Sequence, residues 1–304
     1  MTTQFEIKPQ VPQTQNQHKK PSIGATVGGF AAGWVANNLV SQAPVKLYSP
    51  GVMQKMADLS TNLSADEFTQ VKKAVEDTVK TTGLADKGVE ILKGSGVNAD
   101  QIKDIMSQEL NKGIIKYYPK QCREMLAESS LAQVLDGNNA FYAMQSKKLV
   151  LPEKGMELAG FHEIGHALNA NMSKFGKILQ KSRSLSMLVL PIALISLIKT
   201  KKAPNEKPEG ALDKTTTFIK NHAGKLTFAA FIPVLLEEGL ATIKGNKIAR
   251  NTLTADLAKK VSKSNMLGFS TYLALATMSA VGIWLANKIK DKIAQPKPAV
   301  NTAS

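Results

Sequence analysis

One stretch of the chain constrains the possible folds of this protein more than any other. Residues 266–286, MLGFSTYLALATMSAVGIWLA, carry no charged side chain, and a helix needs about 20 mostly apolar residues to cross a bilayer. Trp284 lies near the end of the stretch, and Lys288, Lys290 and Lys292 follow it, as residues that anchor a helix at a membrane interface do. We therefore expect a C-terminal transmembrane helix at 266–286.

A second charge-free stretch lies near the N-terminus. Residues 22–40, SIGATVGGFAAGWVANNLV, contain two overlapping pairs of small residues at helical spacing, Gly24 with Gly28 and Gly29 with Gly33. Such pairs let helices approach closely in lipid. We expect a membrane helix here, and because the stretch is only weakly hydrophobic, a glycine-rich surface helix is the alternative.

Two shorter apolar stretches, 185–198 and 226–236, contain Pro191 and Pro233. Apolar runs of about 10 to 14 residues are more often buried core helices or re-entrant segments than membrane spans. Between them, the lysine-rich connector 199–225 must lie in water. We expect 185–236 to form an apolar helical hairpin, which either dips into a bilayer or caps the domain, and a further helix at 237–263.

Charge and cysteine content narrow the class of protein. The formal net charge is +15, from 39 basic and 24 acidic residues, and all but three of the basic residues are lysines. Reading nucleic acid favours arginine, whereas lysines beside apolar segments suit an anionic membrane surface. We therefore expect a membrane partner and no nucleic acid. Cys122 is the single cysteine, which excludes an internal disulfide and a thiolate-cluster metal site, and we expect it to be buried.

The ends and the middle of the chain have a different character. Residues 1–21 and 294–304 are polar or proline-rich and are expected to be disordered tails, with no secretory signal peptide at the start. Residues 48–182 indicate a soluble helical region, in which Ser64 and Glu67 form a capping box and a second helix starts at Asn98. Residues 137–152, with AFYAM and KLVL on either side of Gln145 and Ser146, predict a β-hairpin, the only clear strand signal.

The sequence GFHEIGHALN, residues 160–169, follows that hairpin. On a helix, positions i and i+4 share a face, so His162 and His166 can bind one metal ion. Glu163 lies beside them and is placed to accept a proton from a water molecule bound to that metal ion. Gly165 costs about 1 kcal/mol inside a helix, and glycine at such a position usually lets another segment approach.

A catalytic zinc ion needs a third protein ligand. His18 lies in the N-terminal tail and His222 in the lysine-rich connector, so both are poor candidates. Glu237 and Glu238 directly follow an apolar run. A helix cannot direct both side chains at one site, so one is the ligand and the other faces solvent or supports the site from outside.

This order of features resembles the membrane-anchored zinc metalloproteases that include the CAAX prenyl proteases and the bacterial heat-shock membrane proteases. In that family an Asn-Ala-Phe edge strand precedes a His-Glu-x-x-His helix, apolar segments follow, and a Glu-x-x-Ala-Asp motif supplies the third ligand. The matching residues here are Asn139, Ala140 and Phe141, then His162 to His166 with Asn169 after them, then Glu238 to Ala241. The match covers 137–249, about a third of the chain.

The resemblance implies a specific site and fold. His162, His166 and Glu238 would bind one Zn²⁺ per chain, Glu163 would be the general base, and the strand at 139–141 would pair with the substrate. Asn169 and Thr242 would support the ligands, although Thr242 replaces the family aspartate. The expected fold is mainly α (α+β): a zincin-like helical metalloprotease domain with a small β-hairpin or edge sheet, plus membrane helices.

Three functions remain open from the sequence. The first is a membrane-bound zinc endopeptidase acting on membrane or membrane-proximal polypeptides, in a bacterial cell membrane with its active site facing the cytoplasm. The second is a zincin-like pseudoenzyme, suggested by Thr242. The third is a non-enzymatic, basic membrane-interaction protein in which the histidine motif is accidental. Lysines on both sides of the hairpin leave the orientation open, and nothing in the sequence indicates the oligomeric state.

Overall fold

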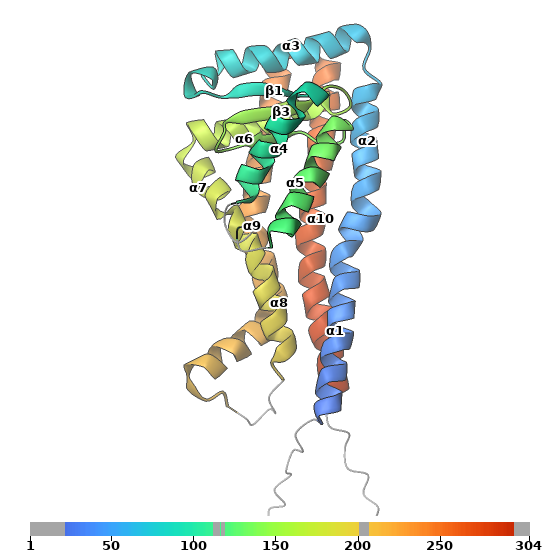
Figure 1. The fold of residues 1–304 in the computed structure, drawn as a ribbon, viewed down its shortest axis with the longest axis vertical. Coiled ribbons are helices and arrows are strands. Elements are labelled where there is room, and N and C mark those ends of the chain that lie inside the picture. The colour runs from blue at the N-terminus through green and yellow to red at the C-terminus, as the bar shows by residue number, and fades with distance from the viewer. Residues whose placement is uncertain (1–21, 112–115, 117–118, 201–206, 295–304) are drawn as a thin grey trace, which may run out of the picture.

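The computed structural model describes residues 22–111, 116, 119–200 and 207–294. The expected tails therefore lie outside the described residues, except for Ala294, which ends the last helix. Figure 1 shows a broad head that holds the strands and most of the shorter helices, with long helices extending away from it. The described protein is mainly α-helical with one small sheet, which confirms the predicted fold class.

The described residues form ten α-helices, some in the head and some in the bundle that extends from it. The bounds of the α-helices are α1 Ile23–Ala43, α2 Ser49–Thr61, α3 Ala65–Thr81, α4 Ala99–Leu110, α5 Lys120–Leu135, α6 Gly160–Met172, α7 Lys174–Ser182, α8 Val189–Ile198, α9 Gly210–Thr252 and α10 Ala255–Ala294. A π-helical turn joins α1 to α2, and a 3₁₀ segment, Arg183–Leu188, joins α7 to α8.

The sheet has three strands in the order β1-β3-β2. Strands β2, Phe141–Ala143, and β3, Lys148–Pro152, pair antiparallel and confirm the predicted hairpin. Strand β1, Glu90–Gly94, pairs parallel to β3 and extends the hairpin to a three-stranded sheet. This strand was not predicted from the sequence. Its sequence, EILKG, is short and only two of its residues are strongly apolar, so its strand signal is weak without the partner strand.

The long helices differ from the expected segments in their boundaries. The expected connector 199–225, hairpin arm 226–236 and helix 237–263 do not form separate units, because α9 runs without a break from Gly210 to Thr252. Pro233 lies inside α9 and does not end it. The next break comes at Leu253 and Thr254, and the expected transmembrane segment 266–286 is the middle of α10.

Three described helical segments are long and apolar enough to cross a membrane: Lys174–Ile198, Gly210–Thr252 and Ala255–Ala294. The expected N-terminal membrane helix at 22–40 forms α1, but α1 is not among these three, because its glycine and asparagine residues lower its hydropathy. It packs along α10 instead. A Cβ added at Gly33 would lie 2.9 Å from the Ala286 carbonyl oxygen, whereas Gly24 and Gly28 face open space, so only one of the predicted glycine pairs makes a close contact.

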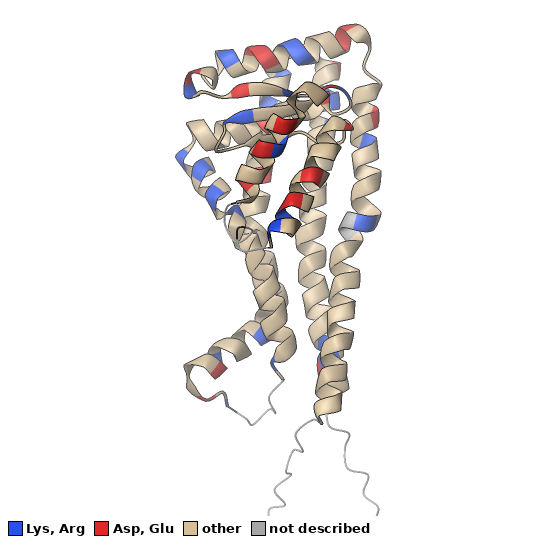
Figure 2. Ribbon diagram, viewed as in Figure 1, with Lys and Arg blue, Asp and Glu red and all other residues tan. Residues whose placement is uncertain are grey.

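Charged residues gather at the two ends of the molecule (Figure 2). Asp, Glu, Lys and Arg cover the head, and a second group lies at the far end of the bundle, while the helices between are almost uncharged. The charge-free stretches are 22–45 through α1, 184–198 through α8, 226–236 in α9 and 264–287 in α10. These stretches lie in the helices between the two charged ends, and together they are called the uncharged belt below.

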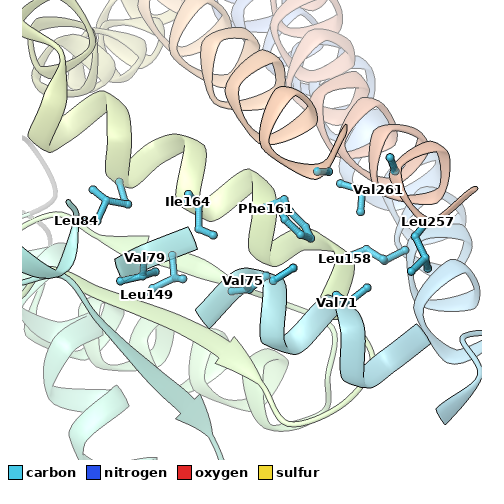
Figure 3. Close-up of a cluster of buried hydrophobic side chains, with 14 of the residues drawn as sticks. Val71, Val75, Val79, Leu84, Leu149, Leu158, Phe161, Ile164, Leu257 and Val261 are labelled. Carbon is cyan, nitrogen blue, oxygen red and sulfur yellow. The ribbon is translucent and has the colours of Figure 1, made fainter. Parts of the chain in front are cut away.

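A buried apolar core holds α6 in place within the head (Figure 3). Val71 and Val75 of α3, Leu149 of β3, and Leu257 and Val261 of α10 all belong to the same buried cluster as two side chains of α6, Phe161 and Ile164. Phe161, which precedes His162, and Ile164, which lies between the two histidines, therefore pack against the core, and the histidine face of α6 is turned toward α9.

Two local predictions have clear outcomes. Ser64 and Glu67 form the predicted capping box at the start of α3, with both reciprocal hydrogen bonds present. Helix α4 begins after Asn98 as expected, but the Asn98 amide donates to the Lys93 carbonyl and does not cap the helix. Cys122 is exposed on α5, so the expectation that it is buried was wrong.

Candidate metal site

Two glycines bring α6 and α9 into close contact. A Cβ added at Gly165 would lie 2.2 Å from the carbonyl oxygen of Ala241, and one added at Gly245 would lie 2.5 Å from that of Phe161. Only glycine permits this approach, which agrees with the prediction that Gly165 admits a neighbouring segment. As a result, the histidines of α6 face the paired glutamates of α9 directly.

The structure brings together His162, His166 and Glu238 from these two helices. His162 Nε2 lies 3.0 Å from Glu238 Oε2 and 3.0 Å from His166 Nε2, and His166 Nε2 lies 3.5 Å from the same carboxylate oxygen. Glu238 is fully buried. This group of two imidazoles and one carboxylate could hold a metal ion.

The outer nitrogen of each histidine also has a partner. His166 Nδ1 lies 2.8 Å from Glu237 Oε1, and since an ionised carboxylate only accepts, Nδ1–H is the donor. His162 Nδ1 lies 3.3 Å from Thr242 Oγ1. Both contacts fix the ring orientation and leave the two Nε2 atoms directed at Glu238, as outer partners of metal-binding histidines do.

Glu237 is buried next to the ligand group and does not face solvent. Its side chain accepts hydrogen bonds from His166, from the Asn169 amide at 3.0 Å and from the Gln180 amide at 3.0 Å. Asn169 thus supports the site through Glu237. The sequence left open whether the second glutamate faces solvent or supports the site. Glu237 supports the site, through its contact with His166.

Arg183 was not identified from the sequence, although it contacts both glutamates. Its Nη1 donates to Glu237 Oε2 at 2.5 Å, and its Nη2 forms an ion pair with Glu238 Oε1 at 2.6 Å. It also lies over the ring of Tyr272 from α10, 5.9 Å from the ring centre. Since Glu238 Oε1 is occupied by Arg183, only Oε2 faces the two imidazoles.

Burial and charge shift the pKa values of two α6 side chains. Desolvation by burial raises the pKa of Glu163, even though the neighbouring histidines act to lower it. Burial acts to lower the pKa of His166, but the carboxylates of Glu238 and Glu237 outweigh it and hold that pKa well above its ordinary value. The site is therefore built to compensate two buried carboxylates with positive charge.

The other residues singled out from the sequence lie in different places. Asn139 and Ala140 precede β2, and Phe141 is its first residue, so all three lie at an edge of the sheet next to α6. Glu163 accepts a hydrogen bond from the Tyr142 backbone of β2. His222 lies on α9 and contacts the Phe218 carbonyl, whereas His18 is outside the described residues.

Comparison with known proteins identifies no relative: no family model, curated protein or solved structure matches this chain.

Proposed function

We propose that this protein is a membrane-embedded zinc endopeptidase, with His162, His166 and Glu238 as the zinc ligands and Glu163 as the general base. The observation that carries the proposal is the convergence of two histidine Nε2 atoms and one carboxylate oxygen from separate helices, all within 4.8 Å of one another. Two imidazole nitrogens and one carboxylate match the donor set of catalytic zinc sites, which leave a fourth position open.

The distances between the ligand atoms are compatible with zinc. Tetrahedral ligands at about 2.0 Å from zinc lie about 3.3 Å from one another. The three pairs here measure 3.0, 3.0 and 3.5 Å, so each differs from the tetrahedral value by a few tenths of an ångström. Only small side-chain shifts are needed to admit the ion.

The chemistry follows from what surrounds these ligands. Zinc, when bound, supplies a Lewis acid that lowers the pKa of water and polarises a carbonyl group. Glu163, one residue after His162 on the same helix, accepts the proton of the attacking water and returns it to the leaving amine. Burial raises the pKa of Glu163, and this strengthens it as a base toward the attacking water.

The substrate is proposed to be a membrane or membrane-proximal polypeptide in extended conformation. An edge strand can pair with an added strand through its backbone, and Asn139, Ala140 and Phe141 lie at such an edge beside α6. The Tyr142 backbone already bonds to Glu163. This hydrogen bond therefore joins the proposed general base, Glu163, directly to the strand that is proposed to bind the substrate.

A position in a membrane is supported by the uncharged belt. At a helical rise of 1.5 Å per residue, the charge-free part of α10, 264–287, is about 35 Å long, enough to cross a bilayer core of about 30 Å. On α9 the exposed Lys225 lies about 20 Å along the helix axis from Glu238. Exposed apolar side chains face outward across this belt, among them Val35, Leu190, Ile232, Leu273 and Val281. The zinc site would then lie at the edge of the bilayer next to the head. We propose a bacterial cell membrane with the head on the cytoplasmic side.

The family resemblance remains part of the proposal. The ligand geometry, the edge strand and the contact between Thr242 and His162 agree with what the membrane-anchored zinc metalloproteases imply for the corresponding positions. Thr242 replaces an aspartate there, and its hydroxyl still reaches His162 Nδ1. The substitution weakens the support of this histidine without removing it.

Proteolysis of an unfolded substrate tests the proposal. Purified protein loaded with zinc is expected to cleave casein, and Glu163→Gln should abolish cleavage while zinc content stays the same. Glu153→Gln, which removes an exposed acid outside the site, is the matched control and should cleave normally. Retained cleavage in Glu163→Gln would exclude the proposed role of Glu163.

The pseudoenzyme is the second candidate, and Thr242 is the observation that favours it. A hydroxyl is a weaker acceptor for His162 than the family carboxylate. Zinc binding by the wild type without cleavage of casein or of membrane peptides would support this reading. Absence of zinc binding would exclude both the endopeptidase and the pseudoenzyme, and a non-enzymatic, basic membrane-interaction protein would be the remaining function.

A further inference from the structure

A second polar site lies at the far end of the bundle, away from the metal ligands. A cleft of about 420 Å³ opens between α9 and α10, and its lining includes Lys220, Trp284, Asn287, Lys288, Asp291 and Lys292. Three lysines and one aspartate give its wall a net positive charge. The helices come close above the cleft, because a Cβ added at Gly224 would lie 3.0 Å from the Ala280 carbonyl oxygen.

Two buried lysines near the cleft already have structural roles. Lys220 Nζ pairs with Asp291 at 2.7 Å and lies 3.3 Å from the Ser196 carbonyl oxygen. Lys290, fully buried, donates to the carbonyl of Lys199. Both ammonium groups lie at the C-terminal end of α8, where unpaired carbonyls favour positive charge, so these two lysines are explained by the fold.

Lys288 and Lys292 are not explained in this way. Both are exposed, and within the described ranges neither forms an ion pair. Lys288 Nζ lies over the Trp284 ring, 5.9 Å from its centre, and Trp284 itself is 55% exposed. A tryptophan and lysines at the end of an uncharged belt are the residues that lie at a membrane interface.

Asn287 supplies an independent sign that a ligand is missing. Its side chain is nine-tenths buried and lines the cleft, and Oδ1 has no hydrogen-bond partner among the described residues. A buried amide oxygen without a partner destabilises the folded protein, because it has lost its hydrogen bonds to water. A ligand that carries both an anionic oxygen and a hydroxyl could bond to the amide nitrogen and to Oδ1.

We propose that this cleft binds the headgroup of an anionic phospholipid with a hydroxylated headgroup, of which phosphatidylglycerol is the simplest. The phosphate lies between Lys288 and Lys292, and a headgroup hydroxyl donates to Asn287 Oδ1. A lipid fits better than a free phosphate because exposed apolar side chains adjoin the cleft on α10, where Val281 is 41% exposed and offers a surface for acyl chains. Basic pockets between membrane helices bind such headgroups.

The inference rests on the proposed position in a membrane but not on the zinc site. Its test is native mass spectrometry of the full chain, released from nanodiscs of phosphatidylglycerol and phosphatidylcholine in equal amounts. One phosphatidylglycerol per chain should be retained in preference to phosphatidylcholine. Asn287→Asp, which keeps the side-chain size and puts a carboxylate beside the phosphate, should reduce this occupancy about tenfold, as should replacing Lys288 and Lys292 together by glutamine.

Control variants decide between the outcomes. Lys225→Gln removes an exposed lysine from the same end of α9 outside the cleft and should retain the lipid. Equal retention of both lipids, or equal loss in Lys225→Gln and the cleft variants, would overturn the proposal. So would displacement of the lipid by millimolar inorganic phosphate, which would identify a free-anion site. Incorporation into nanodiscs and an unchanged thermal unfolding midpoint show separately that each variant is inserted and folded.

Discussion

Each imidazole of the candidate metal site is oriented by a contact at the nitrogen that faces away from Glu238. Glu237 holds Nδ1 of His166, and Thr242 holds Nδ1 of His162. The two contacts differ in strength, because one acceptor is a buried carboxylate and the other a hydroxyl 3.3 Å away. His162 is therefore the less firmly held of the two histidines, and Thr242 is the residue at which the candidate site is easiest to weaken or improve.

Replacement of Thr242 by valine keeps the shape of the side chain but removes the hydroxyl. We expect zinc affinity to fall about tenfold, at the lower end of the range for loss of an outer partner. Thr242→Ser keeps the hydroxyl and should bind zinc as the wild type does. Competition with a chromogenic chelator measures both affinities, and equal affinity in the valine variant would show that Thr242 does not orient His162.

At the scale of elements, the site depends on how closely α6 and α9 pack. Their contact is set by Gly165 against Ala241 and by Gly245 against Phe161, while the core cluster holds the other face of α6. Neither helix can move away without separating the ligands, and neither can move closer. The distances between ligand atoms are thus a consequence of two glycine positions.

Gly165→Ala tests this packing. The added methyl group would overlap the Ala241 backbone, so we expect a loss of about 1 to 3 kcal/mol in stability and a lower zinc content after mild chelation. Gly239→Ala is the control, because its Cβ would meet only the Phe269 ring at an ordinary 3.8 Å. Zinc retention in Gly165→Ala equal to that of the control would contradict the proposed role of the glycine contact.

The start of α3 is joined to α10 through Glu67. This side chain accepts from Lys260 at 2.8 Å and from the Ser64 backbone at 2.9 Å, and these bonds hold the pKa of Glu67 below its ordinary value. A carboxyl whose pKa is lower in the folded state stabilises the protein above its unfolded pKa, and this contribution is lost as the pH falls through the folded pKa. Glu67→Gln should therefore lower the unfolding midpoint at pH 7 and have little effect near pH 3. An equal effect at both values would contradict this.

For the whole molecule, the uncharged belt between head and far end is the dominant feature (Figure 2). If the belt lies in lipid, a lysine at its centre costs about 2.5 to 3.5 kcal/mol, while the same change in the head costs little. Leu273 on α10 and Leu126 on α5 are both 43% exposed and form a matched pair. Leu273→Lys should reduce the fraction of protein that resists alkaline extraction from membranes, and Leu126→Lys should not. No difference between them would argue against the membrane position.

The sequence predicts the parts of this structure that depend on local pattern. Helical spacing and residue type identify His162, His166 and Glu163, and the capping box and hairpin are encoded within a few residues. Glu238 required the family resemblance. Arg183 could not be predicted, because a single arginine in a polar segment gives no signal of the two glutamates it meets from a distant helix. The sequence also did not predict that α9 is a single unbroken helix. Proline within a segment usually indicates a helix end, and the lysine-rich residues before Pro233 are typical of a loop.

Zinc content is the measurement that most directly tests the central claim. Plasma mass spectrometry of purified protein should give about one zinc per chain, and Glu238→Gln, which keeps the shape of the ligand but removes its charge, should lose it. His222→Ala, which removes a histidine of the same helix outside the site, should keep it. Absence of zinc from the wild type after reconstitution, or full retention in folded Glu238→Gln, would contradict the account.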